Sequence, residues 1–181
     1  MTSNVDNRPG AGTGGMTPRS FYTAQTAYLC ATFIATGITP LNAGGYLGFG
    51  GQTVFPTQPT LNIIPNSGTS FNFNIGALPY QSRILRAYTV VGIAEAGMTT
   101  PTLSIGTASG GTQIVNAAAA ASMTTLGTNT LTLVASAAMY VVAVDSEPIW
   151  VNISNSGGAI TNGQFDVILE FALTHGPQGQ F

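Results

Sequence analysis

Apolar and polar residues alternate along residues 165–173, and this period of two constrains the fold more than any other feature of the chain. The apolar residues fall on one side of an extended strand, whereas Asp166 and Glu170 fall on the other, which we expect to face water. The apolar set is Phe165, Val167, Leu169, Phe171 and Leu173. Residues 149–153 alternate in the same way, and the glycine-rich residues between the two segments (154–163, SNSGGAITNG) predict a turn. The two segments together are typical of a closing hairpin.

Further short segments with strand composition run through the chain, separated by clusters of Gly, Ser, Thr and Asn. They are residues 71–75, 84–94, 102–106, 112–115, 130–134 and 139–144. A strand pair alone is marginal in water and needs a second apolar layer. The pattern therefore predicts an all-β fold, an antiparallel β-sandwich with a jelly-roll-like arrangement.

Two regions depart from this pattern. Residues 116–123 (NAAAAASM) are alanine-rich and predict a loop with a short helix. Residues 21–65 contain four prolines and predict two or three short strands joined by long loops.

The domain organisation follows from composition. Residues 1–20 are polar and glycine-rich and predict a flexible N-terminal arm, because such a segment buries too little apolar area to offset its ordering entropy. Residues 21–175 are expected to form a single β-sandwich domain, with the best-defined strands at 71–173. Residues 176–181 are expected to form a short C-terminal tail. The N-terminus carries no apolar run of the kind found in a secretory signal.

Charged residues are unusually scarce. The chain has 181 residues with Lys+Arg 4 and Asp+Glu 6, whereas a typical composition gives roughly 45 charged residues at this length. A surface with so little charge has to rely on Ser, Thr, Asn and Gln, or to lie against other subunits. Four basic residues also disfavour a nucleic-acid partner, whose affinity grows with each phosphate contact. The apolar runs fall short of the roughly 20 residues of a membrane span.

Candidate catalytic, cofactor and metal residues are few. Residues 10–15 (GAGTGG) match G-x-G-x-x-G, but that dinucleotide motif needs a preceding strand, so we interpret them as linker. His175 is the sole histidine, and no serine lies in a nucleophile-elbow motif. Cys30, in an uncharged apolar segment, is expected to be buried and inert. We therefore expect no enzyme activity, cofactor or metal.

Asp145 and Glu147 could contribute to a calcium site or a glycosidase pair, but a solvated turn between two strands is the favoured interpretation. Aromatic residues could line a sugar-binding groove, although core and rim positions are favoured. They are Tyr80, Tyr88, Tyr140 and Trp150.

The arginines are candidates for partner contacts. Arg83 and Arg86 flank the start of a strand, where they can pair with Asp166 or Glu170 or face the acids of a partner.

Three segments of strand and turn residues stand out: LSIGTASGGTQIVNAAA (103–119), MYVVAV (139–144) and IWVNISNSGGAITNGQFDVILEFAL (149–173). They resemble the small β-sandwich domains of tailed-bacteriophage virion proteins, of the capsid decoration (cement) and head-fibre type. The resemblance covers about half of the chain and consists of strand and turn patterns, whereas the first 80 residues resemble no known family.

The resemblance implies a non-enzymatic protein that binds the outside of an icosahedral shell, often as a trimer. The expected partners are further copies of the chain, as a homotrimer, and the major capsid protein, with the virion exterior as its location. The expected partner-binding residues are Arg8, Arg19, Arg83, Arg86 and Trp150. The N-terminal arm, with Arg8 and Arg19, is expected to order on the capsid or on a neighbouring subunit.

Three other functions remain open. A receptor- or carbohydrate-binding head of a fibre or virion surface would present an exposed aromatic patch to a host glycan. A small hydrolase would depend on His175. A main coat subunit of a small virus is disfavoured by the scarcity of basic residues, since such arms neutralise packaged genome.

Overall fold

A computed structural model describes residues 26–37, 60–80, 82–135 and 146–173. Their strands are β1 (Thr26–Ala35), β2 (Thr60–Ile64), β3 (Ser70–Leu78), β4 (Ser82–Ala96), β5 (Thr102–Gly106), β6 (Val115–Ala118), β7 (Gly127–Leu131), β8 (Glu147–Ser154) and β9 (Asn162–Leu173), and α2 (Ala121–Thr124) is a single helical turn. The expected N-terminal arm and C-terminal tail lie outside the described residues, as does the strand expected at 139–144.

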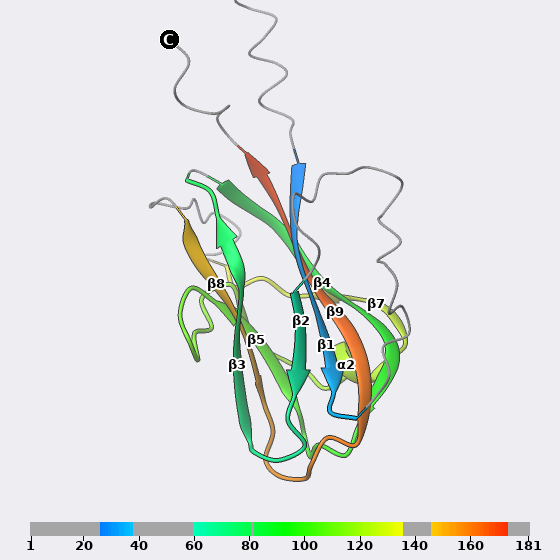
Figure 1. Cartoon of the computed structure of the whole chain (residues 1–181). Coiled ribbons are helices and arrows are strands. Elements are labelled where there is room, and N and C mark those ends of the chain that lie inside the picture. The colour runs from blue at the N-terminus through cyan, green and yellow to red at the C-terminus, as the bar shows by residue number, and fades with distance from the viewer. Residues whose placement is uncertain (1–25, 38–59, 81, 136–145, 174–181) are drawn as a thin grey trace, which may run out of the picture.

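The strands form two sheets that pack face to face, which confirms the predicted β-sandwich (Figure 1). One sheet has the order β2-β1-β9-β4-β7 and the other has the order β3-β8-β5-β6. The pairs are antiparallel except for β1 and β2, which are parallel. Without β2, each sheet holds four strands, and most successive strands alternate between the two sheets.

The core lies between the sheets and is made of the inward side chains of both. At its centre is Phe33 of β1, whose ring is fully buried. The ring stacks on Phe165 of β9 at a centroid distance of 5.5 Å. It meets Phe73 of β3, in the opposite sheet, edge to face at 5.3 Å. These two contacts join the sheets through aromatic rings in a favoured geometry.

The predicted alternation in residues 71–75 is confirmed in β3. Phe71 and Ile75 are buried and Phe73 is half-buried, whereas Asn72 and Asn74 are exposed. The strands expected at 84–94 and 102–106 correspond to β4 and β5. Of the loop with a short helix expected at 116–123, α2 is the helix, whereas residues 116–118 belong to strand β6. Within residues 21–65 the structure describes β1 and β2, in agreement with the two or three strands expected there.

The predicted closing hairpin is wrong, because β8 and β9 belong to different sheets. The connection between them crosses the end of the sandwich and pairs with the loop that follows β4. There the Thr99 backbone N–H donates to the Gly157 carbonyl over 2.7 Å. Gly97 has a φ of +103°, and a Cβ at this position would overlap the Ala159 carbonyl oxygen. The glycine-rich turn therefore fastens one sheet to the other.

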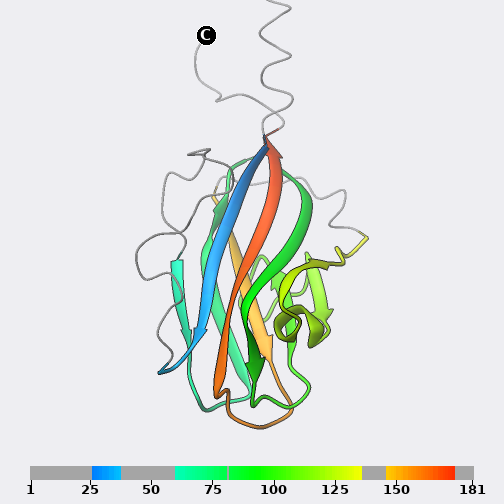
Figure 2. The ribbon, with the colours of Figure 1, turned by 90° about the vertical axis from the view of Figure 1, so that its right-hand side faces the viewer.

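In Figure 2, β1, β9 and β4 lie side by side in front of the four-stranded sheet, and β6, α2 and β7 lie along one side of the sandwich. α2, at four residues, is far too short to span a membrane, and no other helix in the described ranges is long and apolar enough to do so.

Candidate interaction surface

The outer face of the five-stranded sheet differs most from what the sequence predicts. The alternation in β9 predicts that this face is polar and exposed to water. In the structure, however, Ile168 is 1% exposed and Glu170 is 8% exposed. The register explains this, because Ile168 lies between Cys30 of β1 and Tyr88 of β4. Neighbouring side chains on both sides shield the centre of the face. The prediction of a wet outer face on β9 is therefore wrong at these two positions.

Strand β2 continues this face to an exposed apolar edge. Leu61 and Ile63 are 54% and 57% exposed. The parallel register places Leu61 beside Thr32 and Ile63 beside Ile34, which is buried outside the main core cluster. We call Leu61, Ile63 and Ile34 the β2 patch. Its two exposed side chains lie on the end strand of the sheet, the type of position that proteins usually protect with charge or cover.

An ion pair lies on the same face. Arg86 Nε donates to Glu170 Oε2 over 2.6 Å, and its guanidinium lies 5.7 Å from the centre of the Tyr88 ring. The hydrogen bond to Glu170 raises the pKa of Arg86, and burial raises the pKa of Tyr88. Of the alternatives left open for Arg86, the structure shows the pairing with Glu170. The arginine side chain remains 63% exposed, so a partner can still reach it.

A second buried acid, Glu95, has a structural role in the turn after β4. It is 6% exposed, and its Oε1 accepts the Met98 backbone N–H over 2.9 Å. Burial raises its pKa, while the hydrogen bond from Met98 opposes the rise. Glu95 thus closes the turn after β4, and among the described residues it belongs to no cluster of His, Cys, Asp or Glu that could hold a metal ion.

The remaining predicted partner residues do not converge on one site. Arg83 is exposed at the start of β4, and its partner-binding role stays a prediction. Trp150 is half-buried in β8 between inward-facing Ile149 and Val151, so it lies on the outer face of the four-stranded sheet. Tyr88 lies on the outer face of the other sheet, so these two aromatics cannot share a sugar-binding groove.

Several other expected residues can be placed only in part. Cys30 is buried, as expected, and forms no disulfide. Glu147 begins β8 and is half-buried. Arg8, Arg19, Tyr140, Asp145 and His175 lie outside the described residues. Within the described ranges, no three His, Cys, Asp or Glu side chains are grouped closely enough to hold a metal ion.

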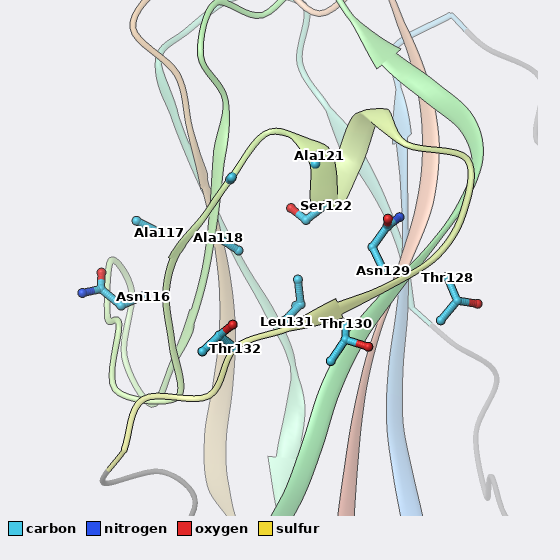
Figure 3. Close-up of a pocket in the computed structure, with 11 residues that line it drawn as sticks. Asn116, Ala117, Ala118, Ala121, Ser122, Thr128, Asn129, Thr130, Leu131 and Thr132 are labelled. Atoms are coloured by element: carbon cyan, nitrogen blue, oxygen red, sulfur yellow. The ribbon is translucent and has the colours of Figure 1, made fainter.

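A pocket of about 570 Å³ lies between β6 and β7 and was not expected from the sequence. Figure 3 shows it bounded by Asn116–Ala118 on one side, Thr128–Thr132 on the other and α2 above. Its side chains are Ala, Ser, Thr, Asn and Leu. The sequence gives little signal for it, since a run of small polar residues is also typical of loops.

No protein-family model and no curated protein matches the chain. A chain of a solved structure described as "Cyanophage Pam1 capsid asymmetric unit" is similar over 82% of this chain and 84% of that chain, with 15% identity and a TM-score of 0.46. A likeness at this level is too weak to assign a role to this chain.

Proposed function

We propose that the chain is a non-enzymatic structural subunit of a virus particle, which binds the outer capsid surface as a decoration (cement) protein. The exposed apolar β2 patch on a nearly uncharged chain is the observation that carries this proposal. The subunit acts as a homotrimer and contacts the major capsid protein. Its mechanism is the repetition of many weak apolar and hydrogen-bonded contacts over a lattice.

The charge distribution supports an assembled protein. Charged residues make up 6% of the chain, well below the about 25% of a typical soluble chain. One of the few cations, Arg86, is already paired with Glu170 within the subunit. Charge therefore contributes little to the choice of partner. Binding has to rely on apolar contacts and on hydrogen bonds between uncharged groups.

The β2 patch provides such a contact. Full burial of a Leu or Ile side chain is worth about 1.5–3 kcal/mol. Because Leu61 and Ile63 are about half exposed, covering them contributes about 1 kcal/mol each, or about 2 kcal/mol together. This corresponds to about a 30-fold change in affinity for one contact, and multivalency multiplies it over a shell.

The fold is compatible with this role. Jelly-roll sandwiches occur in viral capsid proteins and also in lectins, so function has to be argued from the surface. A lectin site would bring aromatic faces together. Among the described residues that line the β6–β7 pocket none is aromatic, and Tyr88 and Trp150 lie on different sheets. These observations favour the structural role over glycan binding.

Binding to shells tests the proposal. The purified chain is co-sedimented with virus shells that lack it, beside the double variant Leu61→Thr/Ile63→Thr and the control Leu126→Thr. Leu126 is 66% exposed and lies between α2 and β7, away from the β2 patch. We expect the wild type and the control to bind alike, and the double variant to bind about 10- to 30-fold more weakly.

Two results would contradict the proposal in different ways. If the wild type fails to bind shells, the capsid role is wrong. If the wild type binds and the double variant binds equally well, the β2 patch is not the contact surface.

A further inference from the structure

The β6–β7 pocket has the shape of a gap between two strand edges. β6 and β7 are the end strands of the two sheets on the same side of the sandwich, joined by α2. They meet at one end, where Val115 and Leu133 form an antiparallel bridge and the Val134 N–H donates to the Ile114 carbonyl over 3.0 Å. From there they diverge toward α2, and the pocket lies between them (Figure 3).

The lining indicates that backbone, as well as side chains, bounds this pocket. Residues 116–119 and 128–132 are consecutive, so each strand presents its edge to the space and not only one face. The side chains are small and uncharged, which leaves the strand edges within reach of a ligand. End strands carry backbone N–H and C=O groups available for pairing. An extended peptide fits such a gap by adding a strand.

Ser122 gives independent support for a ligand. Its side chain is buried, and its Oγ has no hydrogen-bond partner among the described residues. In Figure 3 this side chain lies above Leu131 and points into the space toward Ala118. A buried hydroxyl without a partner is uncommon in native proteins and calls for an explanation. A bound backbone carbonyl or N–H would satisfy it after a small side-chain rotation.

The conformation of β6 fits the same interpretation. Ala117 has a φ of +47°, in the left-handed region that is unfavourable for a non-glycine residue. Its N–H donates to Ser104 Oγ of β5 over 3.0 Å, which holds the bend. The bend lies within the lining of the pocket, at the point where β6 turns away from β7.

We propose that this gap binds an extended segment, residues 20–25 (SFYTAQ), of a second copy of the chain. This segment directly precedes β1 and carries Phe, Tyr and Thr, which favour strands. It is uncharged, like the lining of the gap. Residues 10–19 are poorer candidates, because they are rich in glycine and include Pro18, which has no N–H to donate.

The register of the sheet shows why the segment has to come from another copy. Thr26 pairs with Ala172, which pairs with Arg83, and Ala87 pairs with Leu131. With about 4.8 Å between strands and about 3.3 Å per residue, the far edge of β7 lies roughly 23 Å from Thr26. Residue 22 is four residues before Thr26 and reaches about 14 Å at full extension. The segment therefore cannot fill the gap of its own subunit.

The exchange would link copies of the chain and does not rest on the proposed virion role. The test mixes two cysteine variants, so that a heterodimeric disulfide can form only between copies. One partner carries Thr130→Cys, an exposed position on β7 in the lining of the gap. The other carries Thr23→Cys or, to sample the opposite side of the segment, Ala24→Cys. The control replaces Thr130→Cys with Asn72→Cys, which is exposed on β3.

After oxidation with diamide, we expect heterodimer from Thr130→Cys with at least one segment variant. Its yield should exceed that of the Asn72→Cys control at least about tenfold, the ratio that about 1.4 kcal/mol of docking free energy provides. Addition of Tyr22→Pro to the segment variant should abolish the excess, because proline interrupts strand pairing. Equal yields with Thr130→Cys and Asn72→Cys, or no heterodimer with either segment variant, would overturn the proposal.

Discussion

Mutation of the contact between Phe33 and Phe73 tests most directly how the two sheets pack against each other. Phe33 belongs to the five-stranded sheet and Phe73 to the four-stranded sheet, and their rings meet edge to face at 5.3 Å. Replacing each ring with leucine, singly and together, gives a double-mutant cycle that isolates their interaction. Leucine keeps an apolar side chain at each site and removes the ring.

The structure sets the expected magnitudes. Phe33→Leu removes two ring pairs, one with Phe73 and one with Phe165. Each pair is worth about 0.5–1.5 kcal/mol, so we expect a loss of about 1–3 kcal/mol in the free energy of unfolding. The coupling between Phe33 and Phe73 should be the value of one pair, about 0.5–1.5 kcal/mol.

Urea unfolding measures these free energies, with the fluorescence of the sole tryptophan, Trp150 in β8, as the signal. The control cycle combines Phe73→Leu with Phe171→Leu. Phe171 is also buried in the core but lies about 20 Å along β9 from Phe165, at about 3.3 Å per residue. The control effects should add within about 0.5 kcal/mol. A Phe33–Phe73 coupling no larger than the control would refute the proposed contact between the sheets.

Three further predictions concern Glu95, Arg86 and Gly97. Because burial raises the pKa of Glu95, its folded form favours the proton, and wild-type stability should fall as pH rises through that pKa. Glu95→Gln should lack this fall. In urea titrations from pH 4 to pH 8, the difference in free energy of unfolding between the wild type and the variant should therefore grow with pH. Arg86→Met leaves the nearly buried Glu170 without its partner and should lower the urea midpoint at neutral pH. Arg86→Lys, which can still donate to the carboxylate, should lower it less, and equal midpoints for both variants and the wild type would contradict the pairing. Gly97→Ala should cost about 3–5 kcal/mol through overlap and an unfavourable φ. Gly110→Ala, at positive φ in open space, should cost only about 1–2 kcal/mol, and similar losses in thermal unfolding would show that the packing at Gly97 is wrong.

The alternation of apolar and polar residues was sufficient to predict the layers of the fold. In β3 and β9 every second side chain faces the core, because the side chains of a strand alternate between the faces of a sheet. The pairing of the strands could not be predicted from this alternation. Residues 154–163 look like a hairpin turn locally, but their partner is the loop around Thr99, more than 50 residues earlier. A local pattern carries no information about such a long-range pair.

The candidate surface was also only partly predictable. The opposite charges allowed a pairing of Arg86 with Asp166 or Glu170, and only the register of β4 and β9 shows that Glu170 is the partner. The exposure of Leu61 and Ile63 depends on β2 being the end strand of its sheet, which the sequence does not encode locally. The β6–β7 gap depends on two neighbouring strands joining different sheets, so it too appears only in the assembled fold.

Antibody labelling of intact virus particles tests the central claim, that the chain coats the capsid exterior, most directly. An antibody raised against the folded chain is applied to unopened particles and located by electron microscopy. The account predicts label distributed over the whole shell surface, in keeping with many repeated contacts. Label confined to the tail, or label that appears only after the shells are opened, would contradict it.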